Sequence, residues 1–364
     1  MKKKVVVGMS GGVDSSVAAL LLKEQGYEVI GVTMEIWRME GLEQISAQGG
    51  CCGLDAVEDA RRVAQALDIP HYVMNFREEF QRSVVDYFTA EYLRGRTPNP
   101  CIACNRHIKW EALLKRSLDI GADYIATGHY ARIGRLPNGR LAVKNSATGK
   151  KDQTYVLYPL TQEQLEHTLM PVGEYTKEQI REMAQRAGLS VAYKPDSQDL
   201  CFVPDGDYGA FLEREAPDRV PGEGNFVNAD GEVLGRHKGV VHYTVGQGKG
   251  LGIALGRHVY VTELRPDTNE VVLGEDADVF ARELDCDHLN FMGMADLKEP
   301  RRLWAKVRYA HPGAWCRAVQ TGPDTVHVEF EEPVRAIAPG QAVVFYDGDY
   351  VMGGGTIVKK DAGI

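Results

Sequence analysis

The chain has 364 residues, of which 44% are hydrophobic and 26% charged, and its formal net charge at pH 7 is −9. This length and composition indicate a globular protein of two or three domains, and the net charge argues against one that coats nucleic acid by bulk attraction. The sequence has no long apolar run, no signal peptide after the basic N-terminus and no coiled-coil period. We therefore expect a cytoplasmic monomer with no membrane partner.

The first predicted element is a buried strand over residues 5–7, which leads through a glycine turn directly into a helix. Gly11 and Gly12 allow backbone N–H groups to point into one concavity, and the hydroxyls of Ser10, Ser15 and Ser16 add donors at the helix N-terminus. No lysine follows the second glycine, and Asp14 would repel a γ-phosphate unless a metal intervened. The pattern favours pyrophosphate with Mg²⁺, although an ordinary strand-to-helix turn with a serine cap is the alternative.

Strands alternate with helices over the next 120 residues. Helices are expected at 13–25, 56–67, 79–93 and 101–120, strands at 28–34, 71–75 and 124–127, and an irregular loop at 37–53. Such alternation predicts a doubly wound parallel sheet of the Rossmann-like class, in which ligands bind beyond the carboxyl ends of the strands. The glycine turn, Met34 and Gly128 all fall at such ends.

The C-terminal part of the chain has a different pattern. A hairpin over 132–143 and helices at 162–169 and 177–187 complete the first domain, which we expect to span 1–205. Short alternating segments follow, at 240–243, 258–264, 271–273, 303–309, 315–319, 326–330, 343–346 and 356–359. They predict two small, mainly β domains: a central one over 206–275 and a β-barrel over 276–364.

The seven cysteines are an odd set, which in a reducing compartment indicates thiols rather than a disulfide framework. Cys101 and Cys104 form a Cys-x-x-Cys pair at the start of a predicted helix, where the pKa of a thiol is lowered. A zinc site and a pair of buried thiols are the alternatives for this pair. Cys201 stands alone among acidic and small polar residues, and a structural role is favoured for the adjacent Cys51 and Cys52.

Basic residues are concentrated in three stretches despite the acidic balance. Residues 94–116 hold six Lys or Arg and one acid, 132–151 hold six and no acid, and 301–320 hold five and no acid. Local basic strips on an acidic protein are expected if it binds one polyanion in one orientation, whereas a solvated face is the alternative for any single strip.

Four ordered motifs resemble those of the bacterial tRNA-specific 2-thiouridylases, which are N-type ATP pyrophosphatases with a PP-loop. They are Ser10-Gly11-Gly12-Val13-Asp14-Ser15, the stretch 97–105 (TPNPCIACN), Gly128-His129-Tyr130-Ala131-Arg132 and the stretch 196–202 (DSQDLCF), and the resemblance covers nearly the whole chain. It implies that ATP binds at Gly8, Met9, Ser10, Gly11, Gly12, Val13, Asp14, Ser15, Met34 and Gly128. It also implies that Asn99, Pro100 and Cys101 face the target base, and that Lys151, Asp152, Gln153, Arg308 and Tyr309 contact tRNA.

The implied reaction is thiolation of the wobble uridine, position 34 of tRNA. ATP with Mg²⁺ would adenylate the uracil 2-oxygen, and sulfur carried as a persulfide on Cys201 would displace AMP, with Cys104 as nucleophile and a separate protein as sulfur donor. An iron–sulfur cluster held by Cys101, Cys104 and Cys201 is a second mechanism. It gains weight because this chain has a third thiol at position 101, where some family members carry Asp. Two other functions remain: a PP-loop ligase or amidotransferase-type synthetase acting on a small metabolite, and an RNA-binding module with a relic nucleotide site.

Overall fold

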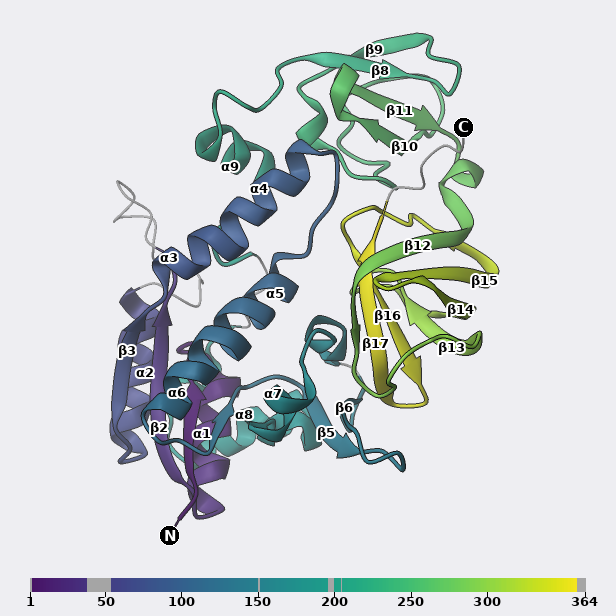
Figure 1. Ribbon diagram of the computed structural model, residues 1–364. Coiled ribbons are helices and arrows are strands. Elements are labelled where there is room, and N and C mark those ends of the chain that lie inside the picture. Colours follow the sequence, from purple (N-terminus) through teal and green to yellow (C-terminus); the bar gives the residue numbers. More distant parts are fainter. Residues whose placement is uncertain (1, 38–53, 150, 196–199, 204, 359–364) are drawn as a thin grey trace. The chain divides into compact units, whose positions relative to one another are not determined.

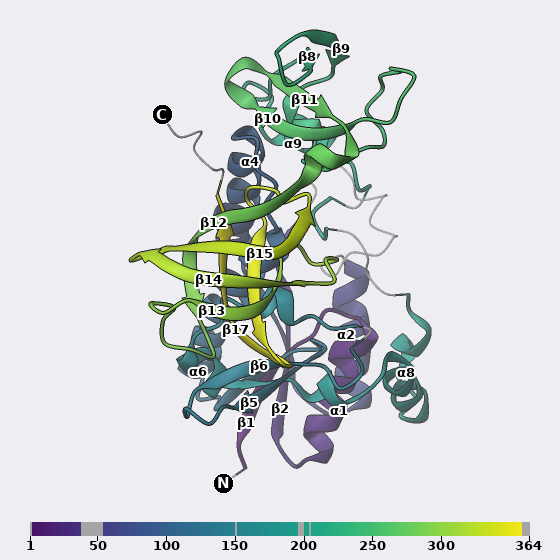
Figure 2. The ribbon, with the colours of Figure 1, turned by 90° about the vertical axis from the view of Figure 1, so that its right-hand side faces the viewer.

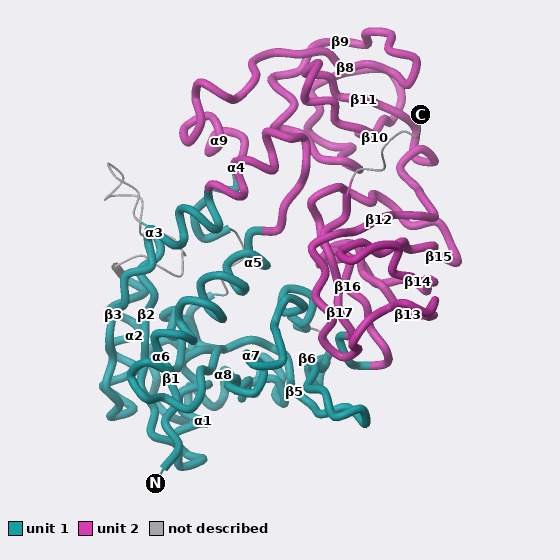
Figure 3. Tube along the Cα trace, in the orientation of Figure 1, with its two compact units in different colours: residues 1–85, 100–206, 349–351 teal, residues 86–99, 207–348, 352–364 magenta. Residues whose placement is uncertain are grey.

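The computed structural model describes residues 2–37, 54–149, 151–195, 200–203 and 205–358. The chain divides into two compact units, shown in Figure 3, and each is considered by itself. The first unit comprises residues 1–85, 100–206 and 349–351, and the second comprises 86–99, 207–348 and 352–364. In the part of the chain that is described, no helix has both the length and the apolar character needed to cross a bilayer.

A five-stranded parallel sheet forms the centre of the first unit, as the alternating pattern predicted. Its order is β3-β2-β1-β4-β7. The bounds are β1 Lys4–Gly8, β2 Glu28–Glu35, β3 His71–Asn75, β4 Tyr124–Ala126 and β7 Thr168–Leu169. Because β2 lies on one side of β1 and β4 on the other, the strand order reverses at β1. In open α/β sheets a ligand binds at this reversal, outside the carboxyl ends of the strands.

Helices cover both faces of this sheet, which confirms the doubly wound class. Three helices pack on one face in a continuous apolar core: α1 (Val13–Glu24), α2 (Leu54–Ala66) and α8 (Lys177–Arg186). Figure 2 shows α6 (Leu114–Asp119) on the opposite side of the strands. Val17 of α1 and Ile180 of α8 are fully buried, and burial of such a side chain contributes about 1.5–3 kcal/mol.

Two predicted helices contain π-helical segments. The first runs through α3 (Arg77–Phe80), η1 (Gln81–Val85) and α4 (Asp86–Leu93), and the second through α5 (Pro100–Ala103), η2 (Cys104–Leu113) and α6. The sequence predicted ordinary helices here, because residue spacing alone does not distinguish i→i+4 from i→i+5 bonding. Long π-helical stretches are rare and frequently occur at functional sites, and η2 begins at Cys104.

The end of the first unit differs from the prediction at one helix. The hairpin of β5 (Ala131–Arg135) and β6 (Leu141–Asn145) is confirmed. The helix expected at 162–169 is wrong at its end, because α7 covers only Gln162–Glu166 and the next residues pair with β4 as β7. The hydroxyl of Thr168 accepts a bond from the buried Trp110 indole, so tertiary contacts override the local helical pattern. Three 3₁₀ turns, η3 (Thr154–Leu157), η4 (Pro171–Glu174) and η5 (Ser190–Tyr193), complete this unit.

The small sheet of the second unit was predicted only in part. Its order is β10-β11-β8-β9, with β8 Gly224–Val227, β9 Val233–His237, β10 Tyr260–Arg265 and β11 Glu270–Gly274, and α9 (Tyr208–Glu215) precedes it. The strand expected at 240–243 is wrong: Val240–His242 forms a 3₁₀ turn after Gly239. These residues are buried, and Tyr243 packs edge-on against Phe226, so their apolar character reflects packing rather than strand pairing.

Six strands close into the predicted β-barrel (Figure 1). They are β12 Phe280–Phe291, β13 Arg301–Lys306, β14 Ala314–Gly322, β15 Thr325–Arg335, β16 Ala342–Asp347 and β17 Tyr350–Ile357. The order is β12-β15-β14-β13-β16-β17, and pairing of β12 with β17 closes the ring. The sequence did not predict β12, and it placed the start of β17 too late because the run Gly353–Gly355 resembles a turn.

A buried histidine in the barrel makes stability depend on pH. His311 is 8% exposed, and its Nδ1 has no hydrogen-bond partner among the described residues. Burial, together with the nearby Arg308 and Lys306, lowers the pKa of His311 to about 4. In the unfolded chain the pKa is near 6.5, so the unfolded state binds more protons as pH falls through this range. The folded state is therefore destabilised between pH 6.5 and about 4.

We predict that lowering the pH from 6.5 to 5 reduces the unfolding temperature less in His311→Asn than in the wild type. In the wild type, keeping His311 neutral in the folded state lowers the free energy of unfolding by on the order of 1 kcal/mol for each pH unit below 6.5. The variant lacks this group and so avoids that loss. Scanning calorimetry at both pH values measures the shift. The control is His288→Asn, which changes an exposed histidine at φ +50°, a conformation that Asn tolerates. An equal pH-dependent loss in His311→Asn and the wild type would refute the prediction.

Candidate functional site

The turn between β1 and α1 has the geometry of an anion-binding loop. Gly12 is the N-cap of α1 and supplies no side-chain cap. Ser15 Oγ and Ser16 Oγ both donate to the Gly12 carbonyl, at 3.3 and 2.8 Å. Gly11 has a φ of +67°, and a Cβ there would lie 2.4 Å from the Ala56 carbonyl oxygen of α2. The loop is therefore held against α2, with the positive end of α1 at the carboxyl edge of the sheet.

Gly128 lies directly against the first turn of α1. A Cβ at this position would lie 2.6 Å from Ser15 N and 2.7 Å from the Asp14 carbonyl carbon, so only glycine fits. On the other side of β1, Met9 N donates to the Val32 carbonyl and Thr33 Oγ1 donates to the Met9 carbonyl. The structure thus brings the predicted loop together with Gly128 and with the end of β2, where Met34 follows Thr33.

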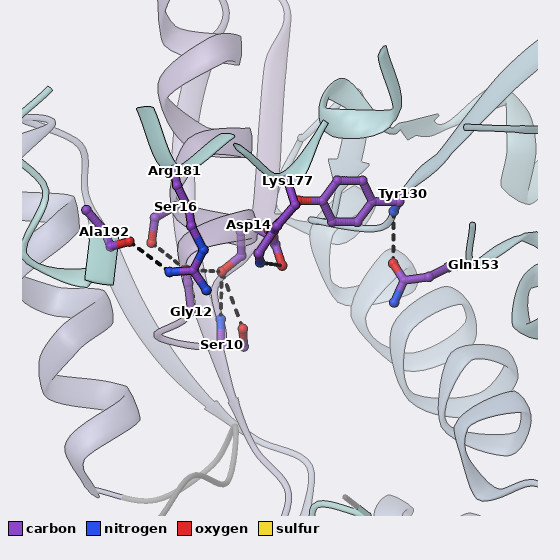
Figure 4. Close-up of polar contacts among 10 residues, drawn as sticks. Ser10, Gly12, Asp14, Ser16, Tyr130, Gln153, Lys177, Arg181 and Ala192 are labelled. Atoms are coloured by element: carbon purple, nitrogen blue, oxygen red, sulfur yellow. Dashed lines mark hydrogen bonds and ion pairs between the residues drawn. The ribbon is translucent and has the colours of Figure 1, made fainter. Parts of the chain in front are cut away.

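The carboxylate of Asp14 is the centre of a polar cluster that the sequence did not predict (Figure 4). Lys177 Nζ, from the first residue of α8, lies 2.7 and 2.8 Å from its two oxygens, and Tyr130 Oη donates to Oδ1 at 2.7 Å. Tyr130 N in turn donates to Gln153 Oε1. Tyr130 could have been identified from sequence only by its position two residues after Gly128. Nothing in the local sequence identifies Lys177 as a site residue, because it is simply the first residue of an amphipathic helix.

His129, between Gly128 and Tyr130, is held as a neutral imidazole. Burial, with a smaller effect from Lys109, lowers the pKa of His129 well below its ordinary value. Its Nδ1 lies 2.7 Å from Thr127 Oγ1. Lys109 Nζ donates to Asn105 Oδ1, and Asn105 Nδ2 donates to the Val156 carbonyl, at 2.7 and 2.9 Å. These bonds fix Asn105, the residue that follows Cys104.

The structure places two of the three candidate cysteines on one helical segment. Cys101 is exposed in α5, and Cys104 is half-buried at the first residue of η2, so both lie at the start of the segment as predicted. Cys201 is half-buried, and the next residue, Phe202, is buried against the rings of Trp37 and Phe80. Residues 196–199 of this motif, and Cys51 and Cys52, lie outside the described residues.

Two further cysteines are unsuited to chemistry. Cys286 and Cys316 are buried in the barrel, and their Sγ atoms donate to backbone carbonyls. Burial raises the pKa of Cys286 above the ordinary range and that of Cys316 to about 12. Both remain protonated near neutral pH, and a protonated thiol is a poor nucleophile.

The three candidate thiols do not form a metal site in this structure. Among the described residues, which include Cys101, Cys104 and Cys201, no three His, Cys, Asp or Glu side chains lie close enough together to hold a metal ion. Magnesium is a different case, because it is bound through one or two carboxylates together with substrate phosphates, and Asp14 is the carboxylate at the loop.

Two of the predicted tRNA-contacting residues have structural roles within the first unit. The Asp152 carboxylate accepts bonds from Ser146 N and Thr154 N, at 3.0 and 3.1 Å. Gln153 exchanges two hydrogen bonds with the backbone of Tyr130. Lys151, by contrast, has an exposed side chain. We infer that Asp152 and Gln153 shape this turn.

Arg308 and Tyr309 lie in the second unit, after β13. Arg308 Nη1 donates to the Arg335 carbonyl at 2.7 Å, and Tyr309 is 47% exposed. On the barrel, the Arg302 guanidinium stacks 3.9 Å from the centroid of the exposed Trp315 ring. Exposed aromatic rings beside arginines are typical of surfaces that stack on unpaired bases. Asn99 also belongs to this unit, and Thr97 before it is bonded to Pro339 and Gln341.

The first basic stretch, 94–116, is less available to a polyanion than its charge count indicates. The nearly buried carboxylate of Glu91 accepts Arg94 Nη1 at 3.0 Å and pairs with Arg96 at 3.5 Å. Arg116 pairs with Glu79 and stacks on Phe76. These arginines neutralise acids that lie outside the stretch, so a local count of charges overstates its basic character.

Three family models match successive parts of the chain. Residues 3–205 match the family model of the tRNA methyl transferase HUP domain, 209–275 the tRNA methyl transferase PRC-barrel domain and 281–357 the aminomethyltransferase beta-barrel domain. Among solved structures, a predicted tRNA methyltransferase subunit from Methanocaldococcus jannaschii is 16% identical with a TM-score of 0.31, covering 50% of this chain and 74% of that one. That likeness is too distant for inference.

Curated relatives are far more similar. A tRNA-specific 2-thiouridylase of Lachnoclostridium phytofermentans is 62% identical over 98% of this chain and 100% of its own. Proteins of the same name from Clostridium perfringens and Clostridioides difficile are 56% and 53% identical, over 98% and 99% of both chains. Identity at this level along the whole chain shows that it belongs to the family of tRNA-specific 2-thiouridylases.

Proposed function

We propose that the protein uses ATP to replace the 2-oxygen of the wobble uridine, position 34 of tRNA, with sulfur. The observation that carries this proposal is the anion-binding loop at the strand-order reversal, against which Gly128 packs. The same unit holds Cys101, Cys104 and Cys201. The names of the relatives supply the substrate and the type of reaction.

Adenylation comes first in this mechanism, because a uracil 2-oxygen is a very poor leaving group. ATP binds with its β- and γ-phosphates on the loop formed by residues 8–15, and Met34 and Gly128 border the nucleotide. The uracil oxygen attacks the α-phosphorus, and pyrophosphate leaves. Asp14 would hold the Mg²⁺ that neutralises charge on the phosphates. The N-terminus of α1 stabilises the charge on the departing pyrophosphate, where the backbone donors are already oriented.

Sulfur transfer follows. A donor protein loads Cys201 as a persulfide, whose terminal sulfur attacks C2 of the adenylated base and expels AMP. The Cys104 thiolate then attacks the Cys201 sulfur, which releases the thiolated base and leaves a Cys104–Cys201 disulfide. An external thiol reduces this disulfide before the next turnover. We favour this relay over an iron–sulfur mechanism because Cys201 lies on a different segment from Cys101 and Cys104, whereas a cluster needs all three thiols fixed together.

The tRNA contacts in this proposal come from both units. The target base leaves its stack, as is usual for enzymes that act on nucleobases, and faces Asn99, Pro100 and Cys101. Lys151 provides a phosphate contact on the turn that Asp152 and Gln153 shape. Arg308 and Tyr309, with the exposed Trp315, contact the RNA from the barrel.

A synthetase acting on a small metabolite would share the loop, but it is not favoured. Such an enzyme needs neither the reactive cysteines nor a barrel with exposed aromatic rings, and the relatives at 53–62% identity are named for tRNA. The direct test is to incubate the protein with ATP, Mg²⁺, bulk tRNA and either sulfide or a persulfide donor with a reducing thiol, and to separate the tRNA on a mercury gel. A retarded, thiolated band is expected. If no sulfur source produces one, the proposal is refuted.

We predict that Ser10→Ala and Asp14→Ala lose activity at adenylation and keep their affinity for tRNA. Both residues lie at the start of α1, where pyrophosphate rests, and neither belongs to a basic stretch. AMP release and tRNA binding, measured separately, distinguish the two steps. Asp123→Ala is the control, because Asp123 caps the opposite end of β1 through Lys4 N. Normal AMP formation by Asp14→Ala would contradict a role for this carboxylate at the phosphates.

The relay makes a prediction about the cysteines. Cys104→Ser and Cys201→Ser should be inactive, whereas Cys101→Ser should keep substantial thiolation activity because the relay uses only two thiols. Multiple-turnover thiolation, with the iron content and visible absorbance of anaerobically purified protein, provides the measurement. A brown, iron-containing wild type that Cys101→Ser both bleaches and inactivates would overturn the relay.

A further inference from the structure

The anion-binding loop lacks a cation of its own. Phosphate loops of the G-x-x-x-x-G-K-[ST] type place a lysine on the β- and γ-phosphates, but here no lysine follows the glycines, and the first turn of α1 carries Asp14. A triphosphate on this loop would therefore lie beside a carboxylate. Positive charge, from Mg²⁺ and from the protein itself, has to offset that repulsion.

The structure brings an ammonium group to this position from a distant part of the chain. Lys177 Nζ lies 2.7 and 2.8 Å from the two oxygens of Asp14, and the Lys177 side chain is only 10% exposed. Its Nζ also lies 5.9 Å from the centroid of the Tyr130 ring, whose hydroxyl bonds the same carboxylate. Figure 4 shows Lys177, Tyr130 and Asp14 converging beside Ser10 and Gly12 of the loop.

The position of Lys177 in its own helix is unfavourable for a lysine. It is the first residue of α8, after the N-cap Thr176, where the helix dipole favours negative rather than positive charge. Asp14, in contrast, occupies the first turn of α1 and is already stabilised there by the dipole. Asp14 therefore does not need the ion pair for its stability. The Lys177 side chain, in contrast, is largely buried at a helix end whose dipole disfavours a positive charge.

Other contacts hold the α8 region against the loop. Lys194 Nζ donates to the Gly11 carbonyl at 3.2 Å and to Asp59 Oδ2 at 2.7 Å. Within the region, Arg181 Nη1 donates to the Ala192 carbonyl at 3.0 Å, which ties α8 to η5. Residues 177–194 thus contact the first turn of α1 through Lys177–Asp14 and the loop through Lys194–Gly11, so Lys177 has a defined position relative to the phosphate site.

We propose that Lys177 is the phosphate-binding cation of this loop. It neutralises Asp14 and donates to the pyrophosphate moiety of bound ATP, since an ammonium group has three donors and bridges a carboxylate and a phosphate at once. Lys177 thus supplies from α8 the charge that other phosphate loops carry within the loop. This inference rests on the proposed use of ATP.

The test measures binding of inorganic pyrophosphate, Mg-ATP and adenosine by titration calorimetry. Lys177→Met should bind pyrophosphate and Mg-ATP roughly ten- to a hundred-fold more weakly than the wild type, because a charge-assisted bond is lost. Adenosine, which has no phosphate, should bind equally to both. Lys3→Met is the matched control: it breaks a 2.7 Å pair with Asp123 at the opposite end of β1 and should bind all three ligands normally.

A second pair of variants separates direct phosphate binding from mere positioning of Asp14. In Asp14→Asn the carboxylate is absent, so a lysine that only positions it has no further effect. If Lys177 contacts phosphate, adding Lys177→Met to Asp14→Asn should still weaken pyrophosphate binding at least ten-fold. The double variant also contains no unpaired buried charge, which keeps the test valid if Lys177→Met alone unfolds.

Each outcome has a distinct meaning. Equal pyrophosphate affinity in Asp14→Asn and the double variant, or in the wild type and Lys177→Met, would overturn the role of Lys177. A wild type that binds neither ATP nor pyrophosphate would instead overturn the proposed use of ATP. Weakened adenosine binding in Lys177→Met would show a general distortion of the site and would also count against phosphate recognition by Lys177.

Discussion

The site depends on the close approach of Gly128 to the first turn of α1. The segment after β4 can reach the Asp14 and Ser15 backbone only because position 128 has no side chain, since a Cβ would lie 2.6 Å from Ser15 N. This approach brings Tyr130 within hydrogen-bond distance of Asp14 and, through Gln153, connects the loop with the turn that carries Lys151. The strand order makes the contact available, because β1 and β4 are neighbours at the point where the order reverses.

The elements that sequence predicted well are those with strong local signals. β1, α1 and β2 combine buried apolar runs with glycine punctuation, and their bounds agree with the structure within one or two residues. The errors occur where tertiary contacts decide. Thr168 leaves a helical pattern to pair with β4, Val240 and its neighbours are apolar because they pack under the small sheet, and the glycines of β17 resemble a turn but pair with β12. Local spacing contains none of this information.

The same distinction applies to the site. The loop, Gly128 and the Cys101–Cys104 pair are contiguous motifs and could be identified from sequence. Lys177 could not, because it lies 163 residues from Asp14 and only the packing of α8 on α1 brings the two together. Charge counting also failed for Arg94 and Arg96, which pair with Glu91, an acid outside the basic stretch. Sequence reasoning thus identified the contiguous motifs of the candidate site but not the long-range ion pairs around them.

The central claim is that the uracil 2-oxygen is adenylated before sulfur replaces it, and isotope transfer tests this most directly. A tRNA labelled with ¹⁸O at the 2-position of the wobble uridine would be incubated with the protein, ATP, Mg²⁺, a persulfide donor and a reducing thiol, and the AMP analysed by mass spectrometry. We predict one ¹⁸O atom in AMP for each 2-thiouridine formed, because the oxygen leaves bonded to the α-phosphorus. Thiolated tRNA accompanied by unlabelled AMP would contradict the mechanism.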